Sequence, residues 1–319
     1  MEKLSQSQVD GVQYRRAKLW QIILVAFNAF NGMAVYFLIG LSSYSASIGY
    51  GIATLVVGGL LTFTRIFDAI TDPLLAFVYD RFQSPFGKVR PLMLIGWAIQ
   101  STGLLCLFHF FSGKGHGIPI FLVFYMLYVI GYTIVNMTAQ TLPALMTNDP
   151  RQRPTVGVWQ TVLNYLTPMA LNIVVYTRIL PAMGGKFNQN FLNTVTWLCV
   201  AVSFVGVALA CIGISAYDKP ENFKGIGKTE KLRLKDMMDV LGHNKPLQSY
   251  IISASSDKIA QQAASASIVG TMVNGILIGD MGLATTLGVI GMLPSILFAM
   301  YGAHYAGKHG NKESIITWT

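Results

Sequence analysis

The sequence predicts an all-α polytopic membrane protein, and three observations lead to that prediction. Of the 319 residues, 53% are hydrophobic and only 12% are charged, about half the charged share of a soluble domain. Long charge-free intervals, such as the one between Lys18 and Arg65, suffice for helices that cross a bilayer core of about 30 Å. The 31 glycines also fit, because glycine is more frequent in transmembrane helices than in soluble ones. This composition argues against a soluble enzyme, a disordered regulator and a nucleic-acid-binding domain.

Each apolar run of sufficient length predicts one membrane span. The interval after Lys18 holds two of them, hinged at the serine-rich stretch 42–47. The residues that follow Lys312 are typical of a ninth span just beginning. The eight complete predicted spans are 19–41, 50–79, 91–112, 118–146, 154–181, 191–216, 247–278 and 281–305.

The positions of lysine and arginine predict the orientation. The formal net charge is +9, and most of the 23 basic residues lie in segments 1–18, 80–90, 149–153, 217–246 and 306–313. The opposite loops hold only Lys114, Arg178 and Lys186, and Arg65 and Lys258 lie within spans. Cytoplasmic loops carry the excess of basic residues. We therefore expect a multi-pass protein of the plasma (inner) membrane with a cytoplasmic N-terminus and no nucleic-acid partner.

Residues 217–246 stand apart because they are polar and strongly charged. They predict a central cytoplasmic loop that separates a first bundle of six helices, 19–216, from a partial second bundle, 247–319. Residues 1–18 form the predicted cytoplasmic N-terminal segment. The second and eighth spans exit through similar sequences, Gly87-Lys88 and Gly310-Asn311-Lys312, which is weak support for two related halves.

The second span carries charged residues at Arg65, Asp68 and Asp72, a spacing that places all three on one helix face. Facing lipid, the trio would cost about 8–10 kcal/mol, so the stripe must face a bundle interior or a water-filled cavity. One interpretation is an internal ion pair between Arg65 and Asp68, with Asp72 hydrated. The other, which we favour, is a site for a sodium ion or a proton, because one arginine cannot neutralise two aspartates.

Other polar residues in the spans have two interpretations each. Lys258 lies on a helix face with Gln261 and Gln262, where it contacts substrate or else lies at the headgroups. Asn136 and Gln140 share one face of the fourth span, and Asn31 lies in the first. Most such amides form interhelical hydrogen bonds, and a minority bind ligands.

Little in the sequence favours an enzyme. The three cysteines lie inside apolar runs, and the sequence contains no Cys/His pattern with metal-ligand spacing, no phosphate-binding loop and no nucleophile–base–acid set. The paired aspartates raise the alternative of an intramembrane aspartyl protease. The two acids of such an enzyme come from different helices, whereas Asp68 and Asp72 lie one turn apart on the same helix.

Two blocks of sequence resemble a known family. The run Arg65-Ile-Phe-Asp-Ala-Ile-Thr-Asp-Pro73, then Asp80-Arg81, then Phe86-Gly-Lys-Val-Arg-Pro91, resembles the glycoside–pentoside–hexuronide:cation symporters of the major facilitator superfamily. The residues from Gly131-Tyr-Thr-Ile-Val135 to Asp149-Pro-Arg-Gln-Arg153 resemble the family's fourth span and the basic loop behind it. The resemblance implies cation-coupled uptake by alternating access between two six-helix halves.

The resemblance also assigns a role to individual residues. The family's cation-site aspartates match Asp68 and Asp72, its fourth-span threonine matches Thr133, and Thr71 stands where the best-known member has an asparagine. The charged residues of the family's sugar site are replaced here by neutral amides, which bond sugar hydroxyls without charge-assisted bonds. The expected substrate-binding residues are Asn31, Asn136, Gln140, Gln160 and Lys258, and the expected gating or structural residues, which latch the inner loops through salt bridges, are Arg65, Asp80, Arg81, Lys88, Arg90, Arg151 and Arg153.

The predicted function is therefore symport of a sugar or glycoside coupled to Na⁺ or H⁺, by a protein that acts as a monomer in the bilayer without a further cofactor. Two alternatives stay open: a carrier of another small polar or amphipathic solute, including a lysophospholipid, and a non-transporting membrane sensor. Because the family has twelve helices, we expect a fragment with eight helices and the start of a ninth. A transport cycle needs both halves, so we expect this chain alone not to transport.

Overall fold

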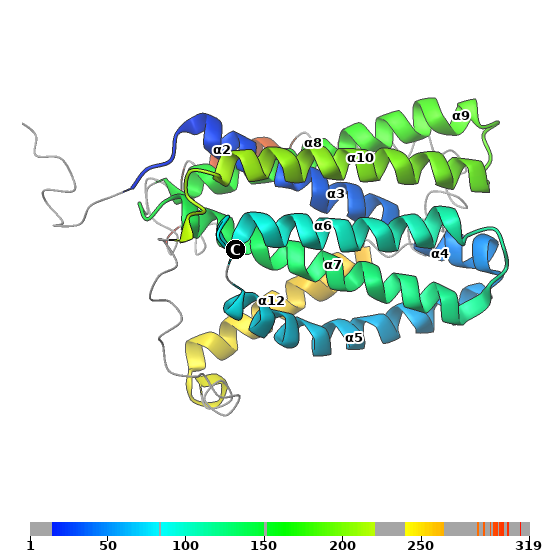
Figure 1. The fold of residues 1–319 in the computed structure, drawn as a ribbon, viewed down its shortest axis with the longest axis horizontal. Coiled ribbons are helices and arrows are strands. Elements are labelled where there is room, and N and C mark those ends of the chain that lie inside the picture. The colour runs from blue at the N-terminus through cyan, green and yellow to red at the C-terminus, as the bar shows by residue number, and fades with distance from the viewer. Residues whose placement is uncertain are drawn as a thin grey trace, which may run out of the picture.

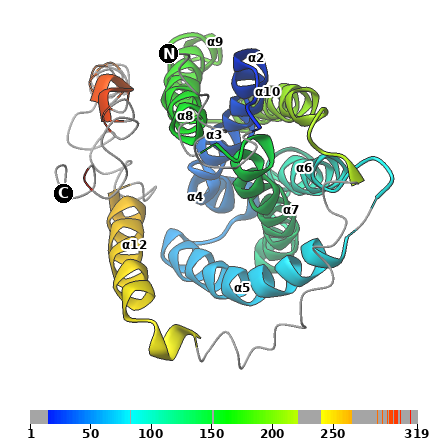
Figure 2. The ribbon, with the colours of Figure 1, turned by 90° about the vertical axis from the view of Figure 1, so that its left-hand side faces the viewer.

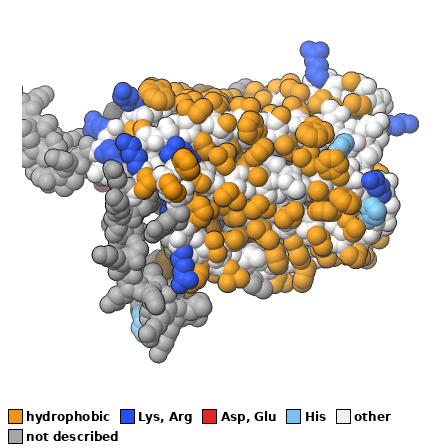
Figure 3. Space-filling view, viewed as in Figure 1, with side chains coloured by type: hydrophobic (Ala, Val, Ile, Leu, Met, Phe, Trp, Pro, Cys, Tyr) orange, Lys and Arg blue, Asp and Glu red, His pale blue; other side chains and the backbone are white. Residues whose placement is uncertain are grey.

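The computed structural model describes residues 15–82, 84–149, 152–220 and 240–264, together with isolated positions between 286 and 313. Long helices run side by side along the length of the molecule (Figure 1). On the face of the bundle shown in Figure 3, hydrophobic side chains are spread over the middle, as expected for a surface that faces lipid.

The first span is longer than predicted. It comprises α2 (Leu19–Ala26), α3 (Asn28–Ile39), α4 (Ser42–Tyr44) and the π-helical turn η1 (Ser45–Gly49). The predicted hinge at 42–47 is wrong, because these serines lie within helical turns. The chain leaves the helix at residues 51–53 instead, where Gly51 adopts a φ of 69° that side chains other than glycine rarely allow.

The next five spans begin and end close to the predicted residues. They are α5 (Thr54–Arg81), α6 (Val89–Leu105) with η2 (Cys106–Phe110), α7 (Gly117–Met146), α8 (Arg153–Val174) with η3 (Val175–Ile179) and α9 (Leu180–Ala182), and α10 (Gln189–Ile214). The seventh predicted span begins as α12 (Lys245–Ala264). The rest of the predicted seventh span lies outside the described residues. So do most of the predicted eighth span and the predicted start of the ninth.

Four of the described helical runs are long and apolar enough to cross a membrane. They are Leu19–Gly49, Val89–Phe110, Gly117–Met146 and Gln189–Ile214. Of the remaining long helices, α5 has 28 residues and α8 has 22, and both carry more polar residues. A polar spanning helix requires a neighbour or an aqueous cavity beside it.

Glycines set the closest helix contact, which joins α6 to α7. A side-chain carbon added at Gly103 would lie 2.6 Å from the backbone nitrogen of Tyr128, and one at Gly131 would overlap the backbone of Gln100. Such small residues allow membrane helices to approach and gain van der Waals contact. The α6–α7 pair therefore forms a rigid centre. Seen from one end of the bundle, α5 lies along one side of α7, and α12 stands at the side of the bundle near one end of α5 (Figure 2).

Candidate cation and substrate site

A hydrogen bond between α5 and α7 forms the centre of the candidate cation site. The buried hydroxyl of Thr133 on α7 donates to the Asp72 carboxylate on α5, with 3.1 Å between the oxygens. Asp72 itself is exposed, whereas Asp68, one helical turn earlier, is half-buried. The structure thus brings together three of the four predicted cation residues, Asp68 and Asp72 through their helix and Thr133 through this bond.

Thr71 completes the predicted set on α5. Its hydroxyl donates within the helix, to the carbonyl oxygens of Phe67 at 3.1 Å and Asp68 at 3.2 Å. The hydroxyl proton therefore takes part in these intrahelical hydrogen bonds. The oxygen still has lone pairs with which it can ligate a cation. The side chain of Arg65 lies outside the described residues, so the predicted Arg65–Asp68 ion pair stays a prediction.

A second bond joins the same two helices two turns further along. The Tyr79 hydroxyl on α5 and the Thr141 hydroxyl on α7 lie 3.0 Å apart. Because Thr141 donates its proton to the Thr138 carbonyl at 2.7 Å, Tyr79 is the donor of this bond. Together the two bonds fix the register of α5 against α7 and hold the Asp72 carboxylate beside the Thr133 hydroxyl.

The charge and ligand types of this site suit a small monovalent cation. Carboxylate and hydroxyl oxygens are hard ligands, which favour cations such as Na⁺ over soft transition metals. Among the described residues there is no group of three or more His, Cys, Asp or Glu residues arranged to hold a metal ion. A pair of carboxylates on an exposed helix face equally suits a proton.

Two predicted substrate residues lie on α7 beside the cation site. Asn136 and Gln140 follow Thr133 by three and seven residues, so they share its helix face, and both are exposed. Gln160 is half-buried on α8 and Lys258 is exposed on α12. Gln261 and Gln262 have side chains outside the described residues.

Asn31 differs from these residues because it is only 2% exposed. Its side-chain oxygen accepts hydrogen bonds from the Gln100 amide and from the Ser203 hydroxyl, the latter at 3.0 Å. Ser203 in turn accepts a bond from the Trp97 indole at 2.7 Å. In this conformation Asn31 therefore joins α3, α6 and α10, and its substrate role stays a prediction.

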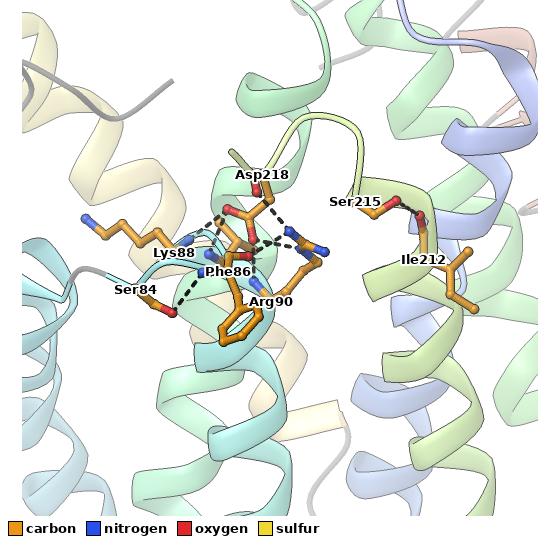
Figure 4. A network of polar contacts seen from close by, with 8 residues as sticks. Ser84, Phe86, Lys88, Arg90, Ile212, Ser215 and Asp218 are labelled. Carbon is orange, nitrogen blue, oxygen red and sulfur yellow. Dashed lines mark hydrogen bonds and ion pairs between the residues drawn. The ribbon is translucent and has the colours of Figure 1, made fainter. Parts of the chain in front are cut away.

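The motif from Phe86 to Arg90 folds around an acid that the sequence analysis missed, Asp218 (Figure 4). This buried carboxylate accepts hydrogen bonds from the backbone nitrogens of Lys88 at 2.8 Å, Val89 at 3.1 Å and Arg90 at 2.8 Å. It also forms an ion pair with the Arg90 guanidinium at 3.3 Å. Asp218 thus satisfies the free N–H groups at the start of α6 from the end of α10.

Gly87 makes this arrangement possible. Its φ is 101°, and a side-chain carbon at this position would lie 2.5 Å from the Asp218 carboxylate carbon. The glycine of the family motif is therefore required for contact with Asp218. One sequence signal pointed to this acid. Asp218 is the first charged residue after the sixth predicted span and lies at the start of the basic loop 217–246.

The other predicted gating residues have different partners. The Arg81 guanidinium lies over the Phe77 ring at 3.7 Å, and the Lys88 ammonium over the Tyr79 ring at 4.5 Å. Arg153 is exposed, while the Asp80 side chain and Arg151 lie outside the described residues. Among the described residues, the predicted gating residue Arg90 forms a salt bridge, and its partner Asp218 was not predicted. The latch between conformations stays a prediction.

A further ion pair ties the residues before α2 to the loop between α7 and α8. Arg16 pairs with the buried Asp149 at 2.5 Å. The Ala17 backbone nitrogen donates to the Gln152 side chain at 2.8 Å, and that side chain donates back to the Ala17 carbonyl at 2.7 Å. Asp149 and Gln152 therefore hold Arg16 and Ala17, the residues just before α2.

These features define a polytopic helical membrane protein with Asp68 and Asp72 on α5. The chain belongs to the family described as MFS/sugar transport protein, whose pattern matches residues 21–319. Members of this family are transporters, so the predicted class is confirmed. The chain is an integral membrane protein with the major facilitator helical fold.

Curated relatives support the same family. The chain is 26% identical over 265 residues to the glucuronide carrier protein homolog of Escherichia coli, and the aligned region covers 82% of this chain and 55% of that protein. It is 25% identical over 223 residues to the lactose permease of Lactobacillus delbrueckii, covering 67% and 35% of the two chains. It is 32% identical over 139 residues to the inner membrane symporter YicJ of E. coli, covering 43% and 30%. The chain thus spans about a third to a half of the length of these relatives.

Proposed function

We propose that residues 19–216 of this chain form the cation-binding bundle of a carrier that couples the uptake of a sugar or glycoside to Na⁺ or H⁺. The observation that carries the proposal is the Thr133–Asp72 hydrogen bond, which places a hydroxyl of α7 beside the carboxylate face of α5. The names of the relatives, a lactose permease, a glucuronide carrier homolog and a symporter, support this substrate class and the coupling.

The cation contributes to the cycle through charge. The carboxylates of Asp68 and Asp72 hold the cation, with Thr71 and Thr133 as additional oxygen ligands. An uncompensated carboxylate is costly to move into a dry interface, so the carrier reorients with its cation and substrate bound, or with protonated acids. Binding shifts a conformational equilibrium only through its different affinity for the two states, and the α5–α7 contact is the place where this difference arises.

The substrate lies next to the cation on α7 in this proposal. Asn136 and Gln140 are exposed on the face that holds Thr133, and their amides donate and accept hydrogen bonds with sugar hydroxyls. The two amides of α7 bond an uncharged glycoside but offer a carboxylate no charge-assisted bond, so of the proposed substrate residues only Lys258 would favour a hexuronate. Gln160 and Lys258 are proposed to reach the substrate from α8 and α12.

The remaining proposals concern topology and assembly. The excess of basic residues on one side places the N-terminus in the cytoplasm of a cell whose plasma membrane holds the carrier. The protein acts as a monomer, and a coupling ion is the only inorganic partner.

Substrate binding to the purified 319-residue chain tests this proposal. Trp fluorescence or calorimetry would be followed for a panel of neutral glycosides and hexuronates, in NaCl and in choline chloride at two pH values. We expect a neutral glycoside to bind more tightly when the cation site is filled. Asn136→Ala and Gln140→Ala should weaken that binding about tenfold, the value of a lost hydrogen bond of about 1.4 kcal/mol. Asn164→Ala, at an exposed amide of α8, is the matched control. If Asn136→Ala and Gln140→Ala both bind the glycoside with wild-type affinity, the substrate assignment is wrong.

A further inference from the structure

Three exposed basic residues converge at the end of the bundle where α2 begins and α10 ends. They are Arg15, Lys18 and Lys219, and we call them the basic rim. Lys and Arg side chains gather at this end of the molecule in the space-filling view (Figure 3). From the structure we infer that the basic rim binds the headgroup of an anionic phospholipid, a site separate from the proposed transport function.

Tyr217 holds the basic rim together. The Arg15 guanidinium lies over its ring, 5.6 Å from the ring centre. Its hydroxyl donates to the side-chain oxygen of Gln21 at 2.7 Å, and the Lys18 backbone nitrogen donates to the same oxygen at 3.0 Å. The Lys219 backbone nitrogen bonds the Tyr217 carbonyl at 3.0 Å. The Arg15 guanidinium and the backbones of Lys18 and Lys219 thus lie around Tyr217 and its partner Gln21.

Among the described residues, the two acids next to this cluster are already paired. Asp149 is buried and paired with Arg16, and Asp218 is buried and paired with Arg90 and the α6 backbone. Their side chains are 3% and 0% exposed, so neither carboxylate reaches the surface. The basic rim therefore presents a positive surface that an external anion can neutralise.

Apolar side chains continue directly from the basic rim along the bundle. Leu19 is 56% exposed, Trp20 is 53% exposed, and Ile212 on the neighbouring α10 is 54% exposed. Tryptophan concentrates at the headgroup level of membranes. A ligand that matches both parts has an anionic phosphodiester for the basic rim and acyl chains for the apolar surface. Phosphatidylglycerol and cardiolipin have this chemistry, and basic surfaces at helix ends attract such lipids.

Lipid binding by the purified 319-residue chain tests this inference. The chain in zwitterionic micelles would be titrated with phosphatidylglycerol or with phosphatidylcholine of the same acyl chains. Retained lipid would be read by native mass spectrometry, and stabilisation by thermal unfolding. We expect preferential retention of phosphatidylglycerol and a higher unfolding midpoint than with phosphatidylcholine.

A paired set of variants locates the site. Lys18→Gln with Lys219→Gln should weaken phosphatidylglycerol binding about 25-fold, which is about fivefold for each basic side chain near an anionic surface. Lys114→Gln with Lys186→Gln makes the same charge change at exposed positions between other helices and should leave binding unchanged. Equal weakening by both pairs, or by neither, would overturn the assignment. Stabilisation by glycerol phosphate alone at the same concentration would also overturn it, because a free anion lacks the acyl chains that the apolar surface requires.

Discussion

The Asp218 contact predicts a large and specific loss of stability when its carboxylate is removed. Asp218→Ala deletes hydrogen bonds to three backbone nitrogens at the start of α6 and an ion pair to Arg90. Breaking a buried pair costs about 3–5 kcal/mol, and helix capping alone accounts for about 1 kcal/mol. Because the Arg90 side chain is 30% exposed and regains water, we expect about 3 kcal/mol for Asp218→Ala. Asp218→Asn keeps one acceptor oxygen and should cost about half as much.

Unfolding titrations of the purified chain in mixed micelles measure this loss, with helical circular dichroism as the signal. Gly87→Ala provides an independent test, because the added carbon would lie 2.5 Å from the Asp218 carboxylate while leaving that carboxylate intact. It should therefore destabilise the chain as well. Lys219→Ala, the exposed residue next to Asp218, is the matched control. If both Asp218→Ala and Gly87→Ala unfold within about 0.5 kcal/mol of the wild type, the usual range of neutral surface changes, the contact does not stabilise the fold and our reasoning is wrong.

Three further predictions follow from the packing. Gly131→Leu should prevent close α6–α7 contact, because any side chain there overlaps the α6 backbone; it should abolish a monodisperse gel-filtration peak, whereas Gly157→Leu, in open space, should not. Asn31→Ala should lower stability by about 1–2 kcal/mol, the range for interhelical bonds in membranes, with unchanged glycoside affinity once folded; a selective loss of affinity would support its predicted substrate role instead. Arg16→Gln leaves the buried Asp149 without its ion pair and should speed tryptic cleavage after Arg15, measured by mass spectrometry; cleavage at the wild-type rate would show that this ion pair does not hold the segment.

Apolar length predicted the spans well because it is set by bilayer thickness. The ends of α6, α7, α8 with α9, and α10 lie close to the residues where polar or charged side chains resume. The serine-rich stretch was wrongly expected to be a hinge. A single serine hydroxyl does not break a helix, whereas the left-handed backbone at Gly51 does.

The candidate site was predictable where one helix carried it. Spacing alone placed Asp68 and Asp72 on one face, and resemblance added Thr133, which the structure brings to Asp72. The partners of Asn31 and Asp218 come from helices far away in the chain. Sequence spacing describes one helix face and not which neighbour covers it, so these contacts needed the three-dimensional structure.

The response of the purified chain to cations tests the central claim most directly. Thermal unfolding of the wild type, Asp68→Asn, Asp72→Asn and Thr133→Val would be compared across NaCl, choline chloride and pH. A cation that binds the folded chain stabilises it by about 2.7 kcal/mol at one hundred times its Kd. Thr62→Val is the control, since this exposed α5 hydroxyl bonds only its own helix at the Gly58 carbonyl. We predict that Na⁺ or protons stabilise the wild type and Thr62→Val, that both aspartate variants lose this response, and that Thr133→Val retains a weakened one. An unchanged cation response in Asp68→Asn and Asp72→Asn would contradict the proposed cation site.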